Sequence, residues 1–195
     1  LKKMAERGVT GAYGSVVWKR DEAYYRSDAW RGTVAHEGGG VMINQAIHTL
    51  DLFHYVVGDI LSVKANMFNY SLENVIEAED TLVAYLGFAD KVKGIFFATN
   101  AYGDNSAPLF EIVFEKGVAR YMDKQLWIDG QIRAEDVQAS VGKDYWGSGH
   151  GRLLHRVYAN DYAFKVEDVK NTMETMFAIY ESAEKGKEVS LDELG

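Results

Sequence analysis

The sequence contains no cysteine, a single proline and no apolar run that approaches the roughly 20 residues of a membrane span. Without cysteine, the chain can have no disulfide scaffold, no thiolate zinc site and no cysteine nucleophile. The N-terminal residues also lack the charged and apolar regions of a signal peptide. From these absences we expect a cytoplasmic protein that does not associate with membranes.

Positive charge is scarce as well. The chain has 21 lysine and arginine residues against 29 aspartate and glutamate residues, which gives a formal net charge of -8. Because the basic residues form no cluster, the chain is a poor candidate for binding nucleic acid. The hydrophobic fraction of 47% and the charged fraction of 26% are ordinary for a globular protein.

The 195 residues show no linker, repeat or low-complexity segment, so we expect a single domain over residues 1–195. The first residue is leucine rather than methionine, and it opens a polar stretch typical of the end of a helix. We therefore interpret the chain as part of a longer reading frame, with a natural stand-alone domain as the alternative.

Hydrophobic periodicity predicts the order of the secondary-structure elements. The expected elements are a helix tail over 1–7, a strand over 9–19, a loop over 21–40, a helix over 41–57, strands over 60–70, 80–88, 92–99, 109–115, 118–122 and 125–128, and helices over 152–162 and 168–185. Short connections between successive strands indicate antiparallel hairpins. This order predicts an α+β fold with an open, largely antiparallel sheet and helices packed on one face. We expect the acidic segment 77–80 to be solvated.

Both faces of the predicted sheet carry apolar side chains. In the strand over 80–88, Leu82 and Leu86 point to one face, while Val83 and Tyr85 point to the other. An exposed apolar sheet face usually mediates association, so we expect a homo-oligomer built on the open face. Coverage of that face by loops is the alternative.

The helix predicted over 41–57 has a polar stripe on an apolar background. Asn44, His48, Asp51 and Tyr55 follow one another at steps of four, three and four, which places them on one helical face. Histidine suits acid–base catalysis near neutral pH, and Asn44 and Asp51 could orient it. A purely structural histidine is the alternative. His48 and Asp51 supply only two metal ligands with no third nearby, so we expect no metal site.

Three glycines, Gly38, Gly39 and Gly40, lead directly into this helix. Because they have no side chains, a ligand or another stretch of backbone could approach the N–H groups at the start of the helix closely. Beyond such contacts of Gly38, Gly39 and Gly40, we expect no cofactor-binding residues in this chain.

Several motifs occur in an order that resembles a known family. They are Tyr24-Tyr25, Trp30-Arg31-Gly32, Gly38-Gly39-Gly40, the run from Asn44 to Asp51, Glu79-Asp80-Thr81, Gly147-Ser148-Gly149-His150 and the run from Ile179 to Ala183. Together they resemble the C-terminal domain of the Gfo/Idh/MocA oxidoreductases, the relatives of glucose–fructose oxidoreductase and inositol 2-dehydrogenase. The resemblance covers essentially the whole chain.

The resemblance implies an N-terminal Rossmann domain that binds NAD or NADP, followed by this domain, which supplies substrate contacts and the oligomer interface. The implied reaction transfers a hydride between a hydroxyl-bearing carbon of a sugar or polyol and the nicotinamide. His48 would take the hydroxyl proton, with Asn44 as its catalytic partner. Asp51, His150, Arg31 and Trp30 would contact the substrate. For Arg31 a salt bridge, and for Trp30 simple packing, are the alternatives.

Two departures from the family pattern bear on the activity. Asn44 stands where members with an acid–base pair usually carry aspartate, and an amide supplies no negative charge. The sequence also has no Gly-x-Gly-x-x-Gly unit between a strand and a helix, and no Glu-Lys-Pro motif. We therefore expect this chain alone to bind no dinucleotide and to be inactive. A non-catalytic dimerisation or ligand-binding module of the same fold is the alternative, and a metal-dependent hydrolase using His48 and Asp51 is remote.

Overall fold

The computed structural model describes residues 8–137, 149–161 and 167–193. In these residues a nine-stranded open sheet forms, in the order β8-β7-β6-β5-β1-β4-β3-β2-β9. The strands are β1 (Val9–Val17), β2 (Ile60–Phe68), β3 (Thr81–Phe88), β4 (Lys93–Thr99), β5 (Leu109–Phe114), β6 (Gly117–Met122), β7 (Gln125–Ile128), β8 (Gln131–Glu135) and β9 (Val189–Ser190). The predicted α+β fold with an open, largely antiparallel sheet is confirmed.

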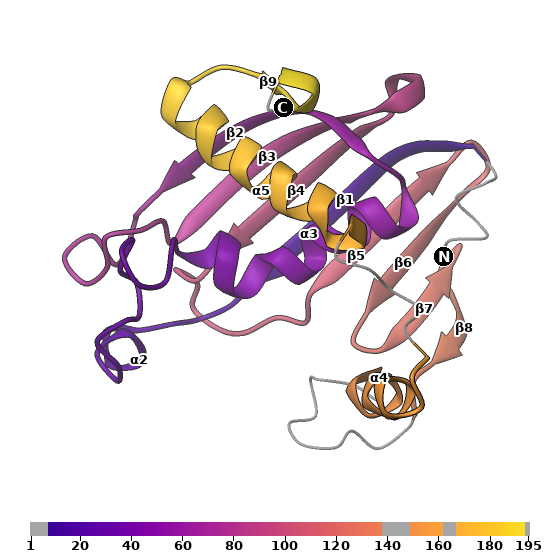
Figure 1. Ribbon diagram of the computed structural model, residues 1–195. Helices are drawn as coiled ribbons and strands as arrows, with labels where there is room; N and C mark the ends of the chain where they lie inside the picture. The colour runs from indigo at the N-terminus through magenta and orange to yellow at the C-terminus, as the bar shows by residue number, and fades with distance from the viewer. Residues whose placement is uncertain (1–7, 138–148, 162–166, 194–195) are drawn as a thin grey trace.

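Two helices, α3 and α5, lie across the same face of the sheet (Figure 1). The helical elements are α2 (Glu22–Tyr25), the π-helical turn η1 (Met42–Ala46), α3 (Ile47–Val56), the 3₁₀ turn η2 (Ala89–Lys91), α4 (Gly149–Tyr158), α5 (Glu167–Lys185) and the 3₁₀ turn η4 (Leu191–Glu193). None of the helices in the described ranges is long and apolar enough to cross a membrane. The helix tail predicted over 1–7 lies outside the described residues.

The sheet is antiparallel except where β1 runs beside β4. The two strands pair in parallel from Gly11 opposite Lys93 to Val17 opposite Thr99. A parallel pair needs a crossover connection, and the segment that holds α3, β2 and β3 provides it. As a result α3 crosses directly over β1 at the centre of the sheet (Figure 1).

The core beneath α3 is built around Phe53. Its ring meets Phe96 and Phe110 edge to face, with centroid separations of 5.8 and 5.0 Å. Gly14 of β1 lies under the same ring, where an added Cβ would come within 2.7 Å of Phe53. A fully buried phenylalanine contributes about 3–5 kcal/mol relative to alanine. This packing fixes the position of α3 on the sheet, and with it the polar stripe.

Two hairpins use the left-handed residues that tight turns require. Asp123 and Lys124 join β6 to β7 with φ values of 50 and 62°, and Asp129-Gly130 joins β7 to β8 with φ values of 50 and 77°. Two consecutive positive φ angles match the twist of a two-residue hairpin. The strand β8 was not predicted, because all five of its residues are exposed and show no apolar alternation.

The face of the sheet opposite α3 and α5 carries exposed aromatic and aliphatic side chains. Tyr85 of β3 is 56% exposed and Ile95 of β4 is 44% exposed. The strand register places Tyr85 opposite Ile95, and Ile95 opposite Tyr13 of β1. A continuous apolar row therefore crosses three strands of the open face, as the alternation in the sequence predicted.

His54 links α3 to α5 and makes stability depend on pH. Its Nε2 atom lies 2.9 Å from Thr175 Oγ1, and its buried Nδ1 has no hydrogen-bond partner among the described residues. Burial lowers the His54 pKa below the ordinary value of 6.5, although the carboxylates of Asp59 and Asp51 oppose this.

We expect acidification below about pH 6.5 to destabilise the chain through His54. In that range His54 binds a proton more readily in the unfolded state than in the folded state. The stability that the neutral His54 contributes is therefore fully present above the unfolded-state pKa and is lost as the pH falls below that pKa. Urea unfolding at a series of pH values measures this slope. The His54→Gln variant should have a shallower slope between pH 7 and about pH 5, and an unchanged slope would contradict the assignment.

Candidate active site at the start of helix α3

The polar stripe begins in a π-helical turn and continues into α3. Asn44 lies in the turn and is half-buried, and His48 lies in the first turn of α3 and is exposed. Asp51 is half-buried, while Tyr55 is 60% exposed near the end of the helix. Single π-helical turns are rare and occur frequently at functional sites. The sequence predicted an uninterrupted helix over 41–57, so the π-helical turn is a difference between the predicted and the observed helix.

The structure gives the members of the stripe different partners. Asn44 Nδ2 donates a hydrogen bond to Glu37 Oε1, and Thr172 Oγ1 of α5 donates to Asp51 Oδ1 at 2.6 Å. Among the described residues, none makes a hydrogen bond to the imidazole of His48. The expected orientation of His48 by Asn44 and Asp51 is therefore not present in this structure, and its catalytic role stays a prediction.

A pocket of about 320 Å³ opens beside the π-helical turn. It is lined by Trp30, His36, Glu37, Ile43 and Asn44. The indole of Trp30 is 42% exposed, so an apolar ring is presented beside polar groups. An aromatic wall with a few placed polar atoms is typical of small-molecule sites. His36 and Glu37 did not figure among the predicted site residues.

Arg31 is held within the loop that carries Trp30. Its guanidinium stacks 4.5 Å from the ring centroids of both Tyr24 and Trp30. Its Nε donates to Asp28 Oδ2 at 2.9 Å, and its Nη1 donates to the Tyr24 hydroxyl at 2.8 Å. The salt bridge that was weighed as an alternative for Arg31 is thus present, and Arg31 positions Trp30. Contact of Arg31 or Trp30 with a substrate stays a prediction.

The glycines before the helix allow close packing inside the domain. An added Cβ on Gly40 would lie 1.8 Å from the backbone oxygen of Glu79, and one on Gly39 would lie 2.0 Å from the Tyr180 hydroxyl. Of the two alternatives drawn from the sequence, the structure thus shows another backbone at Gly40. Gly38 is exposed, with a φ of 88°, and its contact with a cofactor stays a prediction.

The Glu79 side chain accepts hydrogen bonds from backbone N–H groups at the start of the helix. Its carboxylate accepts hydrogen bonds from the backbone N–H groups of Gly40 and Met42 at 3.1 and 2.9 Å, and from the Tyr180 hydroxyl at 3.1 Å. Burial raises the pKa of the Glu79 carboxyl, and these hydrogen bonds oppose the rise. Because these two N–H groups already donate to a carboxyl, they do not fit the pyrophosphate of a dinucleotide.

The prediction that segment 77–80 is solvated holds for Glu77 and was wrong for its last three residues, of which Ala78 is buried with the two carboxyl groups. Glu79 and Asp80 are 8% and 0% exposed. The Asp80 carboxylate accepts hydrogen bonds from the backbone N–H groups of Tyr70 and Ser71 at 2.9 and 2.8 Å, and from Thr81 Oγ1 at 2.8 Å. Such donors compensate the cost of burying a charge. The feature of the sequence that indicated a structural role for these two carboxylates was the Glu79-Asp80-Thr81 motif.

Gln45 connects the π-helical turn to Asn100 by a hydrogen bond. Asn100, at the end of β4, donates from Nδ2 to Gln45 Oε1 and to the Tyr25 hydroxyl, both at 2.9 Å. Burial raises the pKa of Tyr25 to about 12. Gln45 was missed as a candidate because it lies off the polar stripe, although it adjoins Asn44 in the sequence.

His150 belongs to the first turn of α4, and its side chain lies outside the described residues. The Gly147-Ser148 part of its motif is also outside them. The role of His150 at the substrate therefore stays a prediction.

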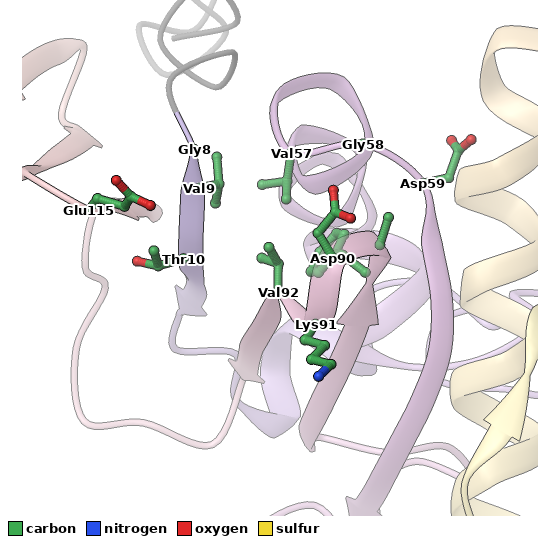
Figure 2. Close-up of a pocket in the computed structure, with 12 residues that line it drawn as sticks. Gly8, Val9, Thr10, Val57, Gly58, Asp59, Asp90, Lys91, Val92 and Glu115 are labelled. Atoms are coloured by element: carbon green, nitrogen blue, oxygen red, sulfur yellow. The ribbon is translucent and has the colours of Figure 1, made fainter.

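The larger pocket of about 680 Å³ lies at the other end of α3 (Figure 2). Asp59, Asp90 and Glu115 contribute carboxylates to its lining, and Lys91 contributes an ammonium group. None of the predicted site residues lines it. Within the described ranges, no three histidine or acidic side chains gather in an arrangement that could hold a metal ion.

Comparisons with known proteins extend this description. A family model described as the GFO/IDH/MocA C-terminal domain matches residues 1–120. No curated protein matches the sequence of this chain. Similar solved structures are the WlbA dehydrogenase from Bordetella pertussis in complex with NADH and UDP-GlcNAcA, and levoglucosan dehydrogenase in complex with NADH and levoglucosan.

The WlbA structure is 25% identical with a TM-score of 0.74, and levoglucosan dehydrogenase is 18% identical with a TM-score of 0.77. Each match covers 97% of this chain, but this chain spans only 57% of WlbA and 61% of levoglucosan dehydrogenase. The resemblance drawn from the motifs is confirmed. Since the family model covers more than half of its residues, the chain belongs to the GFO/IDH/MocA family and carries the C-terminal domain of that family.

Proposed function

We propose that this chain forms the substrate-binding half of an NAD(P)-dependent oxidoreductase that acts on a hydroxyl group of a sugar, a polyol or a related compound. The observation that carries the proposal is the exposed imidazole of His48 on a helix otherwise fixed in the core. Asn44, four residues before His48, lines the pocket beside Trp30, whereas His48 lies outside the lining of that pocket. Relatives of the same fold solved with NADH and with UDP-GlcNAcA or levoglucosan support this substrate class.

In the proposed reaction His48 accepts the proton of the substrate hydroxyl while the hydride leaves the carbon that bears it. Removing that proton relieves the developing positive charge on the oxygen and yields a carbonyl group. Asn44 offers its side-chain oxygen as an acceptor to a neighbouring hydroxyl, and Trp30 covers one wall of the pocket. A nicotinamide held by a second domain of the same protein supplies the hydride acceptor.

The test compares this chain with an enzyme that joins it to the dinucleotide-binding domain of the same protein. The joined enzyme should reduce NAD or NADP in the presence of one or more members of a panel of neutral sugars, polyols and sugar acids. The chain alone should show no turnover and no heat of binding with NADH or NADPH. A joined enzyme that binds the cofactor but oxidises no member of the panel would favour a non-catalytic module of the same fold.

We also propose that the chain assembles into a homo-oligomer through the open face of the sheet. The apolar row from Tyr13 through Ile95 to Tyr85 supports this proposal, because exposed apolar surfaces of this kind usually mediate association. A sheet-to-sheet contact would remove the exposed Tyr85 and Ile95 side chains from water.

Sedimentation measures this assembly directly. We expect the chain to have a mass that is a multiple of 21.9 kDa, and Tyr85→Lys should return it to the monomer mass. The matched control is Phe177→Lys, because Phe177 is 58% exposed on α5, which covers the other face of the sheet. Dissociation by the Phe177 variant and not by the Tyr85 variant would place the interface on the helical face instead.

A further inference from the structure

The loop before α3 brings a carboxylate into direct contact with the polar stripe. Glu37 Oε1 accepts a hydrogen bond from Asn44 Nδ2, and Glu37 Oε2 accepts one from the backbone N–H of Gly32. Both Glu37 and Asn44 are half-buried, and both line the pocket beside Trp30. Gly32 has a φ of 69° and lies against Ile76, so the donor to Glu37 is held by the packing of its loop.

This contact determines which way the Asn44 amide faces. An ionised carboxylate only accepts hydrogen bonds, so the nitrogen of the amide must face Glu37. The Asn44 side-chain oxygen then points away from Glu37, and within the described residues it has no hydrogen-bond partner. The pocket therefore presents an acceptor from Asn44 with a defined orientation.

The same contact brings a carboxylate beside the amide of Asn44. Asn44 itself is neutral, and the other carboxylate of the stripe, Asp51, accepts a hydrogen bond from Thr172 of α5 rather than from Asn44. The titratable groups around Glu37 include the Tyr25 hydroxyl and the imidazole of His36, which lines the same pocket. The pKa of Tyr25 is raised mainly by burial, and the charge of Glu37 adds to this rise.

We propose that Glu37 is a positioning residue of the site, which fixes the Asn44 amide with its oxygen toward the substrate and supplies from the loop the negative charge that position 44 lacks. This inference rests on the proposed function for its catalytic consequence, but the contact itself can be tested on this chain alone. A carboxylate at both positions would place two like charges side by side, and one of them would keep its proton to a higher pH.

The first experiment follows side-chain amide resonances of this chain by NMR during a pH titration. The Asn44 amide should shift as the Glu37 carboxyl titrates, and Glu37→Gln should abolish this step. Asn69 is the matched control, because its amide donates to the backbone oxygens of Ile76 and Ala78 and should respond in neither protein. An Asn44 amide that ignores the Glu37→Gln change would overturn the proposal.

The same pH titration, applied to variants of Glu37 and Asn44, tests whether Glu37 places a negative charge beside position 44. In Asn44→Asp, one carboxyl of the pair should titrate well above the usual range for an acidic side chain. The exchange variant Glu37→Gln with Asn44→Asp keeps one carboxylate and one amide, with the hydrogen bond reversed, and should titrate normally. Ordinary titration of both carboxyls in the single variant Asn44→Asp would show that the two side chains do not interact, and would overturn the proposal.

The second experiment measures turnover in the enzyme joined to its dinucleotide-binding domain. Glu37→Gln and Asn44→Asp should each lower kcat by about 10²-fold with a smaller change in KM, because they misplace a group at the reacting centre. The exchange variant should recover most of the loss. Loss in both single variants without recovery would reduce Glu37 to a structural role. Absence of turnover in the unmodified enzyme would instead contradict the proposed function, while the amide titration would still decide the contact.

Discussion

Replacing His48 by alanine is expected to lower kcat by about 10²–10⁴-fold in the enzyme joined to its dinucleotide-binding domain. The size of the loss follows from the proposed reaction, because without a base the alcohol proton would have to leave to water as the hydride departs. His48 is exposed and its imidazole makes no hydrogen bond within the described part of the chain, so removal of the side chain should leave the fold intact. Steady-state rates and the urea midpoint of the same preparation measure both effects.

The matched control is His155→Ala, which removes an exposed histidine from α4. This variant should retain turnover, so that a general sensitivity to histidine loss is distinguished from a role at the site. Equal turnover of the His48 variant and the unmodified enzyme, at unchanged stability, would remove His48 from the mechanism.

The strands could be predicted because local signals and tertiary structure agree there. Period-two alternation and turn residues such as Asp123-Lys124 predicted the strands from β2 to β7, with ends within one to two residues of those observed. The short strands β8 and β9 were missed. The first has no buried residue, and the second has only two residues, which is too short for a pattern to be recognised.

The π-helical turn could not be predicted, because its causes lie far away in the sequence. Glu79, next to the start of β3, accepts hydrogen bonds from the backbone N–H groups of Gly40 and Met42. Asn100, next to the end of β4, donates a hydrogen bond to Gln45. Local periodicity contains no information about such partners. The family resemblance located the segment correctly, but the details of its backbone depend on these contacts.

The members of the stripe were identified by spacing, but their partners were not. Helical steps of three and four indicate which residues share a face and not what lies opposite that face. Asp51 meets Thr172, which is 121 positions away, and Asn44 meets Glu37, which lies in a loop with no regular pattern. A carboxylate directly before the glycines was a signal that pointed to Glu37, once Asn44 was recognised as uncharged.

The tight packing at Gly40 leads to the second large effect that we expect. Gly40→Ala should destabilise the chain by about 3 kcal/mol or more, a large share of the roughly 5–15 kcal/mol that holds a typical domain folded. The added Cβ would lie 1.8 Å from the backbone oxygen of Glu79 and 2.8 Å from its carbonyl carbon. Because both atoms belong to the backbone at the start of β3, they cannot rotate away as a flexible side chain would.

Gly103→Ala provides the control for the loss of a glycine as such. Gly103 is exposed, an added Cβ there meets nothing within 4 Å, and its φ is not in the left-handed region. Its substitution should change the free energy of unfolding by less than about 0.5 kcal/mol. Urea unfolding of the two variants measures the contrast, and equal midpoints would mean that the start of the helix is not held against Glu79. If the contrast is observed, Gly40 serves the packing that places Asn44 and His48 on the sheet.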